Sequence, residues 1–503
     1  MKRVLTGITA VWGGQLISMA EAFAIVPIYL AYWSAGRYGE WLALSALVAY
    51  LGTLDFGMNM AGGNKLTQLY AKGDLAEYDR YQRAALFFYM GIAVVGTAVL
   101  GLLAVFLPIS QLLGFHDTTP REAGLVTFLL GSQVLWSLPG GLIMGIYRTT
   151  GDLATSQWVR NSTSIIGIAA SAACLLFGGG MATMATVQLT CLAIGVTGVL
   201  IDVHRRFPEL MPSLWGADMV LVRELVRPSA LFGMIILSEA VRLQGTVLLI
   251  SSLLGGPAVA LFVSSRTLCN AVRQLAGNLQ SAFWPHITAL DAQKRESTMR
   301  DFHRLWVLGS ITSCVCVAAA IWFEGTDVIR VWTHGKLVGD SNLLRLLLLQ
   351  LVLQSPWQAS SLITAASSKH DRLSYSYLAS SATALLIAAL TYSRLGLIAI
   401  PVGSISAEAI FCYHFVTVDT CKRIAEQYWP FAARQWSFLG LVWGLALLAA
   451  WGMHIVAFGP SPFRWAEVGI ASSTAAVAVF WIVGLGASER NMIKGLAGVV
   501  RAR

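Results

Sequence analysis

Charged side chains are scarce in this sequence: Asp, Glu, Lys and Arg make up 12% of its 503 residues. That is about half the share found in an average soluble protein. So few charges cannot coat the surface of one or several water-soluble domains. The hydrophobic residues (Ala, Val, Ile, Leu, Met, Phe, Trp, Tyr and Cys) make up 56%. Together these proportions indicate an integral membrane protein.

The sequence also lacks a long polar segment. The longest gap between its apolar stretches, residues 202–227, is well short of the roughly 50 residues that an independent domain needs. A separate soluble catalytic domain is therefore excluded. The seven cysteines lie within or beside apolar stretches and have neither the spacing of zinc ligands nor that of a disulfide framework. We predict no metal site, no catalytic residue and no cofactor.

About fourteen stretches are long and apolar enough to cross a bilayer, since each span needs about 20 mostly apolar residues. Such continuous runs differ from the alternating strands of an outer-membrane barrel. We therefore predict an all-α integral membrane protein. The predicted spans are residues 8–31, 40–61, 84–107, 123–147, 161–178, 181–201, 228–252, 257–280, 305–323, 342–366, 373–392, 395–416, 438–457 and 467–486.

Basic residues are unequally distributed between the two sets of loops. If the amino terminus is inside, most Lys and Arg residues, Arg148 and Arg160 among them, fall on the inside. The positive-inside rule then predicts that both termini are cytoplasmic. Topology and anionic lipid headgroups account for the net charge of +9 without a nucleic-acid partner.

A weak internal repeat predicts two related halves. Asn64–Ala85 aligns without gaps with Pro285–Trp306, and Glu21-Ala22 aligns in nearly the same register with Glu239-Ala240. Six spans per half is an even number, so the halves would be parallel repeats around a central cleft. The predicted organisation is a six-helix bundle at 1–204, a cytoplasmic linker at 205–227, a second six-helix bundle at 228–416, and two additional helices with a cytoplasmic tail at 417–503.

Charged residues inside the predicted spans are the first candidate site residues, because each costs about 2.5–3.5 kcal/mol at a helix centre. Arg266 and Arg273 are seven residues apart and share a helical face with Asn270. With Arg242 they predict a cationic cavity wall suited to phosphate, pyrophosphate or an acidic sugar. The alternative is charge pairing, since Glu239 and Arg242 are three residues apart and spaced to neutralise each other.

Amide and acidic side chains complete the candidate set. Gln350, Gln354 and Gln358 form a polar stripe on one helical face, which either lines the cavity or hydrogen-bonds neighbouring helices. Carboxyl groups within spans are candidates for proton or ion coupling, or for charge pairing. These residues are Glu21, Asp55, Glu239 and Glu408.

Two regions carry a resemblance to a known family. The first is YGEWLALSALVAYLGTLDFGM at Tyr38–Met58, followed by KLTQLYAKGDLAEY at Lys65–Tyr78; the second is LLGGPAVALFVSSRTL at Leu253–Leu268, followed by the segment that begins at Pro285. They resemble bacterial polysaccharide-biosynthesis membrane proteins of the O-antigen flippase type, in the multidrug, oligosaccharidyl-lipid and polysaccharide exporter (MOP) superfamily. The resemblance covers nearly the whole chain and implies about twelve to fourteen helices in two bundles.

The resemblance also implies a function in the bacterial cytoplasmic membrane. The protein would be a flippase that moves an undecaprenyl-pyrophosphate-linked oligosaccharide to the periplasmic leaflet by alternating access. Its partners would be this lipid-linked oligosaccharide, membrane lipids and other polysaccharide-assembly membrane proteins. A cationic cavity is typical of lipid-linked flippases, in agreement with the independent interpretation of Arg242, Arg266 and Arg273.

Two other function classes stay open. A multidrug and toxin extrusion antiporter of the same superfamily would expel organic cations and prefers an acidic cavity, which Glu21, Asp55 and Glu239 favour and the buried arginines oppose. A membrane glycan polymerase or acyltransferase would need acid, base or nucleophile groups on a sizeable outside loop. The outside loops, at 108–122 and 324–341, are short. We therefore predict a transporter that is not an enzyme.

Overall fold

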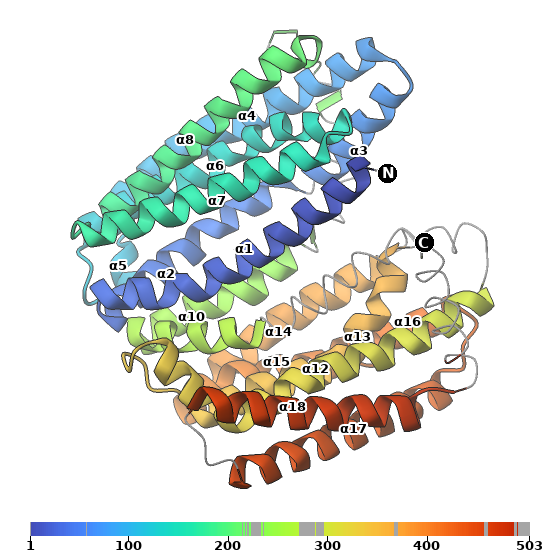
Figure 1. Cartoon of the computed structure of the whole chain (residues 1–503). Helices are drawn as coiled ribbons and strands as arrows, with labels where there is room; N and C mark the ends of the chain where they lie inside the picture. The colour runs from blue at the N-terminus through green and yellow to red at the C-terminus, as the bar shows by residue number, and fades with distance from the viewer. Residues whose placement is uncertain are drawn as a thin grey trace. The chain divides into compact units, whose positions relative to one another are not determined.

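The computed structural model describes residues 2–56, 58–213, 215–216, 218, 221–222, 233–234, 236–270, 287, 296–366, 371–456, 461–486 and 490. Over these residues the chain consists of helices and short connections, with no strand (Figure 1). The predicted all-α class is confirmed to that extent. The chain divides into two compact units, Met1–Ala260 and Leu261–Arg503, which are described separately below.

The amino-terminal unit is built around helix α6, which packs against α2, α3, α4, α7 and α8. Helix α1 packs mainly against α7, and α10 packs against α2. Residues 236–240 are helical as well, and a helical segment at 256–270 crosses the boundary between the two units. The elements are α1 (Lys2–Tyr32), α2 (Ala35–Ala49), η1 (Tyr50–Asp55), α3 (Met58–Ala71), α4 (Leu75–Phe106), α5 (Ile109–Leu112), α6 (Pro120–Thr149), α7 (Leu153–Leu176), α8 (Met181–Arg206), η2 (Pro208–Leu210), η3 (Val241–Gly245) and α10 (Thr246–Leu254).

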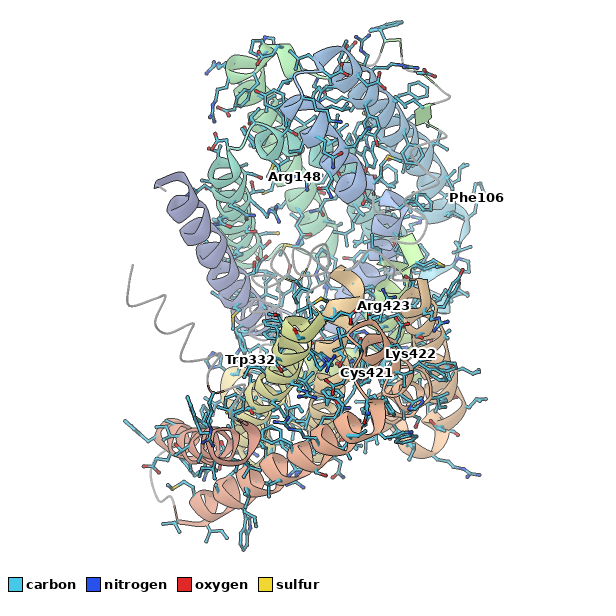
Figure 2. The ribbon with its side chains drawn as sticks, turned by 90° about the vertical axis from the view of Figure 1, so that its right-hand side faces the viewer. Phe106, Arg148, Trp332, Cys421, Lys422 and Arg423 are labelled. Carbon is cyan, nitrogen blue, oxygen red and sulfur yellow. The ribbon has the colours of Figure 1, made fainter. Side chains whose placement is uncertain are left out.

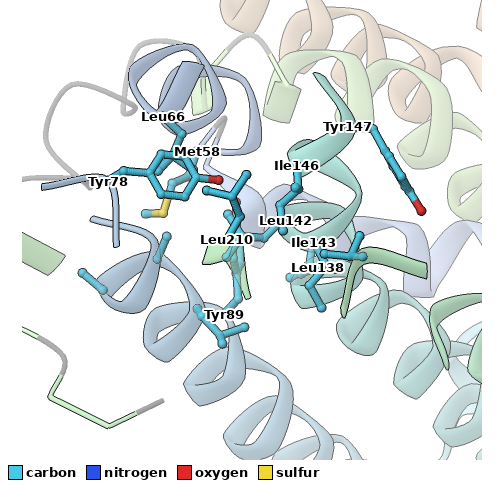
Figure 3. Packing of buried hydrophobic residues seen from close by; sticks show 14 of the residues in the cluster. Met58, Leu66, Tyr78, Tyr89, Leu138, Leu142, Ile143, Ile146, Tyr147 and Leu210 are labelled. Atoms are coloured by element: carbon cyan, nitrogen blue, oxygen red, sulfur yellow. The ribbon is translucent and has the colours of Figure 1, made fainter. Parts of the chain in front are cut away.

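A hydrophobic cluster joins α3, α4 and α6 in this unit (Figure 3). Its buried members include Met58 and Leu66 from α3, Tyr89 from α4, and Leu142 and Ile146 from α6. Burial of such side chains contributes about 1.5–3 kcal/mol each in water, whereas in a bilayer the close van der Waals contact itself holds the helices together. The cluster fixes α3 against α6, the two helices that also contribute to the cavity described below.

The carboxy-terminal unit is organised by α12 and α13. Helix α12 packs against α13, α17 and α18, while α13 also contacts α15 and α16, and α14 packs along α15. The elements are α12 (Glu296–Trp332), α13 (Ser341–Ala366), α14 (Asp371–Leu395), η4 (Gly396–Ile398), α15 (Ala399–Phe411), α16 (Phe415–Arg423), α17 (Tyr428–Val456), α18 (Ser461–Val479) and η5 (Phe480–Gly484).

Ten helices in the described part of the chain are long and apolar enough to cross a membrane, judged by length and composition. Two of the fourteen predicted spans, 373–392 and 395–416, correspond to α14 and α15, which pack along each other and are counted together in this total as the run Arg372–Arg423. The apolar part of α1, Ile17–Tyr32, is shorter than the other spanning helices. Predicted span 257–280 continues beyond the described residues. The total of fourteen stays a prediction.

The predicted span 40–61 is wrong as a single helix. Helix α2 ends at Ala49 and η1 follows. Phe56 then adopts the left-handed conformation, with φ of +49°. Helix α3 begins at Met58, where the Asp55 carboxylate accepts hydrogen bonds from the backbone N–H and the side-chain amide of Asn59. The sequence hid this break because the stretch is apolar apart from Thr53, Asp55 and Asn59, and the Asp55 carboxylate stabilises the new helix start by accepting a backbone N–H.

The first compact unit reaches further along the chain than the bundle predicted at residues 1–204. It includes α10, because the backbone of Gly256 approaches α2 so closely that a Cβ at Gly39 would lie 1.8 Å from the Gly256 carbonyl oxygen. The predicted repeat stays a prediction, since most of the first half of Pro285–Trp306 lies outside the described residues.

Candidate functional site

The amino-terminal unit contains a cavity of about 690 Å³ between α3, α6, α7 and α8. Its volume lies in the range of small-molecule sites. Leu66 and Leu142 line the cavity and also belong to the hydrophobic cluster. The described polar and charged lining residues are Asn59, Ser137, Arg148, Thr149, Ser156, Gln157, Arg160, Thr163 and Ser164. Hydroxyl, amide and guanidinium groups therefore face one space, with no aspartate or glutamate among these lining residues.

Arg148 reaches the cavity from the last turn of α6 (Figure 2). Its Nη2 donates a hydrogen bond of 3.4 Å to the backbone carbonyl of Asn59 in α3. Gly63 makes this approach possible, because a Cβ at that position would lie 1.5 Å from Arg148 Nη2. Because Gly63 of α3 has no side chain, the Arg148 guanidinium of α6 can lie against the α3 backbone.

Arg160 supplies the second positive charge from the amino-terminal part of α7. Its side chain is exposed, and within the described residues it makes no ion pair. Arg148 is partly buried and likewise makes no ion pair within the described residues, its only described polar contact being the Asn59 carbonyl. A guanidinium remains protonated at any ordinary pH. The cavity therefore carries two charges that no described carboxylate neutralises.

Nearby acidic residues are engaged elsewhere. Asp152, the N-cap of α7, forms an ion pair with Arg206 and accepts a 2.8 Å hydrogen bond from the Thr155 hydroxyl. Burial tends to raise the pKa of Asp152, but hydrogen bonds from Arg206 and Thr155 outweigh it and lower the pKa below the ordinary value of 3.8. Asp202 accepts a 2.6 Å hydrogen bond from the Tyr147 hydroxyl. These contacts keep both carboxylates from compensating the cavity charges.

Sequence reasoning did not select Arg148 and Arg160 as site residues, because arginines at helix ends were explained by membrane orientation alone. A signal was present in the glycines of the facing helices. Gly63 of α3 and Gly195 of α8 both line the cavity, as do Gly140, Gly141 and Gly145 of α6. Glycines gathered beside a basic residue leave a hollow that a cation can line.

The predicted cationic wall is only partly described. Arg242, on the π-helical turn η3, forms an ion pair with Glu239, with Nε 3.0 Å from Oε2. This contact is the one that the pairing alternative describes, while the part that either residue plays in a site stays a prediction. Arg266 places its guanidinium 5.3 Å from the centre of the Phe262 ring, and Asn270 is partly buried. Arg273 lies outside the described residues, so its place in a site stays a prediction.

The predicted amide stripe meets one of the predicted carboxylates. Gln350 and Gln354 of α13 donate to Glu408 of α15 at 3.1 and 2.8 Å, and Trp357 adds a third hydrogen bond of 3.3 Å. Glu408 is only 4% exposed. Sequence reasoning missed Trp357, although it lies one turn beyond Gln354. The third amide of the stripe, Gln358, accepts a hydrogen bond from Ser361 through its backbone carbonyl.

The two remaining acidic candidates differ in environment. Asp55 caps α3 and also accepts a 2.5 Å hydrogen bond from the Tyr89 hydroxyl, so its contacts are those of a structural residue. Glu21 is partly buried on α1, and no side-chain hydrogen bond to it occurs among the described residues. A role for either in ion coupling stays a prediction. No group of three or more His, Cys, Asp or Glu residues able to hold a metal occurs in the described chain.

No protein-family model matches the sequence, and no curated protein is significantly similar to it. Solved structures are similar. The lipid II flippase MurJ, in an inward closed conformation, superposes with a TM-score of 0.67 at 10% identity, covering 95% of this chain and 99% of MurJ. An inward-facing multidrug resistance MATE family transporter of the MOP superfamily gives a TM-score of 0.66 at 15% identity, covering 82% and 94%.

A MATE transporter from Vibrio cholerae is also similar, with a TM-score of 0.55 at 14% identity over 84% of this chain and 96% of that one. At these identities the likeness concerns the fold. It nevertheless extends over nearly the full length of each of these proteins. The chain therefore has the fold shared by MATE transporters and MurJ, the fold of the MOP superfamily.

Proposed function

We propose that this chain is a membrane transporter that moves an anionic, lipid-linked oligosaccharide across the bilayer. The fold supports transport in general, since the similar structures are a lipid II flippase and multidrug transporters rather than enzymes. Fold alone does not select between an anionic and a cationic substrate. The charge of the cavity makes that selection.

The observation that carries the proposal is the pair of arginines in the cavity, Arg148 and Arg160, without a described acidic lining residue. A phosphate charge about 4 Å from one guanidinium gains roughly 4 kcal/mol at an effective dielectric constant near 20. An organic cation at the same place would be repelled by a similar amount. The cavity therefore favours a pyrophosphate or another anion.

The other lining groups suit the sugar part of such a substrate. Asn59, Gln157 and the hydroxyls of Ser137, Ser156 and Thr163 can exchange hydrogen bonds with sugar hydroxyls. The cavity holds part of a headgroup, and a polyprenyl tail would stay in the lipid. We extend the proposal to an undecaprenyl-pyrophosphate carrier in the bacterial cytoplasmic membrane, with both termini cytoplasmic, in a cell-surface polysaccharide pathway.

Residues of both units that were predicted from the sequence would contribute as well. In this proposal Arg266, Arg273 and Asn270 of the carboxy-terminal unit, and Arg242 of the amino-terminal unit, each belong to cationic cavity walls, while Gln350, Gln354 and Gln358 line a polar surface. Glu21, Asp55, Glu239 and Glu408 take part in coupling or in charge pairing. The hydrogen bonds from Gln350 and Gln354 to Glu408 support the view that the polar stripe of α13 and the carboxylate of α15 act together.

Transbilayer movement in proteoliposomes tests the proposal. A fluorescent undecaprenyl-pyrophosphate disaccharide serves as probe, and a membrane-impermeant reductant reports the fraction exposed outside. We expect Arg148→Gln combined with Arg160→Gln to slow movement at least about tenfold, because two attractive charges are lost. The matched control is Lys72→Gln with Arg205→Gln, two exposed basic residues of the same unit outside the described cavity lining. Equal rates in both double variants would contradict the proposal.

A cation-coupled multidrug antiporter is the second candidate. The MATE likeness supports it, and the buried Glu408 carboxylate is a group that could exchange a proton. In that case a proton gradient would drive uptake of an organic cation such as ethidium, and Glu408→Gln would abolish the uptake. Retained uptake in this variant would argue against coupling through Glu408.

A further inference from the structure

The carboxy-terminal unit has a cavity of its own, about 460 Å³ in volume, where α13, α14 and α16 meet. It is lined by different residues from the cavity between α3, α6, α7 and α8, and the proposed transport activity does not use it. The residues important below are Arg372, Tyr375, Phe415, Asp419 and Lys422. They come from the start of α14 and from α16.

The cavity has an excess of positive charge. Asp419 is its only carboxylate among the described lining residues, and Asp419 accepts a 3.0 Å hydrogen bond from Arg423, beside the cavity. Arg372 lies 3.6 Å from the same carboxylate and its side chain is 76% exposed, so most of its donors are available. Lys422, in the last turn of α16 (Figure 2), has no described ion pair. A guanidinium and an ammonium therefore share one space.

Exposed aromatic rings lie in this cavity and beside its lining residue His414. Tyr375 and Phe415 are 61% and 58% exposed, and Trp429, at the start of α17, is 75% exposed. His414 connects the set, with a 2.7 Å hydrogen bond to Tyr428 and its ring centre 6.1 Å from that of Trp429. Exposed Tyr and Trp beside Lys and Arg are typical of the depth at which a membrane protein meets lipid headgroups.

We propose that this cavity binds the phosphate of an anionic phospholipid headgroup. Arg372 donates its planar pair of N–H groups to the phosphate oxygens, and Lys422 approaches as a point charge. The hydroxyl of Ser376, another lining residue, is suited to the polar end of the headgroup. Tyr375 and Phe415 contact the upper part of the acyl chains. A free phosphate has the same charge but cannot use these aromatic contacts.

Lipid binding to the full-length protein in detergent tests this site. The probe is short-chain phosphatidylglycerol, with the number of bound lipids read by native mass spectrometry and the affinity by titration. We expect Arg372→Gln combined with Lys422→Gln to weaken binding of one lipid at least about tenfold, since each basic residue contributes appreciably to anionic-lipid attraction. The charge-preserving pair Arg372→Lys and Lys422→Arg should lose less affinity than the double glutamine variant, because both charges remain although the planar contact of Arg372 is lost.

The control is again Lys72→Gln with Arg205→Gln, which removes one lysine and one arginine of the other unit, both exposed. Unchanged lipid binding in the cavity variant, or an equal loss in this control, would overturn the site. Competition separates the two sources of phosphate. Inorganic phosphate should displace the lipid only at far higher concentration; displacement at equal concentration would overturn the lipid assignment in favour of a free phosphate.

Discussion

At the residue scale, the position of the Arg148 side chain depends on a glycine, Gly63, in the facing helix. The guanidinium occupies the space above Gly63, where any Cβ would be 1.5 Å from Nη2. A methyl group there must displace the arginine, since the clash is with the end of a flexible side chain while the α3 backbone is fixed by its packing on α6. Gly63 therefore determines where the positive charge of Arg148 lies in the cavity.

We predict that Gly63→Ala slows movement of the anionic lipid probe at least about tenfold, because small displacements of a positioning group have large effects on rate. The neighbouring Gly62 provides the matched control. A Cβ at Gly62 would meet Met58 and Tyr81 at 3.8 Å, an ordinary contact. Gly62→Ala should therefore transport normally and gain slightly in helix stability. Similar rates in the two alanine variants would show that Arg148 need not lie where it does.

At the scale of elements, ion pairs formed by carboxylates connect neighbouring helices. Asp152, at the start of α7, pairs with Arg206 at the end of α8. Because the folded-state pKa of Asp152 is below 3.8, the pair stabilises the fold above that pH. The contribution is lost as the pH falls through the lowered pKa. Its size is at most about 1 kcal/mol, since both side chains are partly exposed.

Asp152→Asn should therefore lower the thermal midpoint by at most about 1 °C near neutral pH and make little difference near pH 3. Asparagine caps a helix about as well as aspartate, so the variant removes the charge pair and keeps the cap. Scanning fluorimetry in detergent at several pH values measures this. A deficit that stayed constant down to pH 3 would assign the effect to capping instead of charge.

A second carboxylate joins α12 to both α17 and α18. Glu324 is 1% exposed and bonds His454 at 2.5 Å and Arg464 at 2.7 Å. Arg464→Gln would leave this buried charge with one partner, and we expect a loss of about 3 kcal/mol in the free energy of unfolding. Arg330→Gln is the control, because Arg330 is 63% exposed and lies 3.7 Å from Asp327. Equal shifts of the unfolding midpoint would show that the Glu324 contacts stabilise little.

The elements also show what a sequence can predict. Apolar runs of about 20 residues identified most spanning helices, since hydrophobic length is a property of each segment alone. The break at Asp55–Phe56 was missed because hydropathy reports neither the contact that the Asp55 carboxylate makes with the next helix nor the left-handed backbone of Phe56. The Gln350–Gln354–Glu408 contact was foreseen only as two separate groups, because spacing along α13 says nothing of what α15 presents to it.

At the scale of the whole molecule, composition and the resemblance together predicted the transporter fold that the similar structures share. The cavity lined by Arg148 and Arg160 was not predicted. Its lining includes glycines from three helices that are distant in sequence, α3, α6 and α8. Buried charge in a span attracts notice, whereas Arg148 and Arg160 at helix ends are also explained by orientation. Only the packing of the helices shows whether a basic residue near a helix end lies in a loop or lines a cavity.

The central claim is that the protein selects a negatively charged substrate, and a comparison of two probes in the same proteoliposomes tests it most directly. One is the fluorescent undecaprenyl-pyrophosphate disaccharide, and the other is ethidium under an imposed proton gradient. The account predicts rapid, protein-dependent movement of the lipid-linked anion and no protein-dependent uptake of the cation. Gradient-driven ethidium uptake without movement of the lipid probe would contradict it and would establish the antiporter in its place.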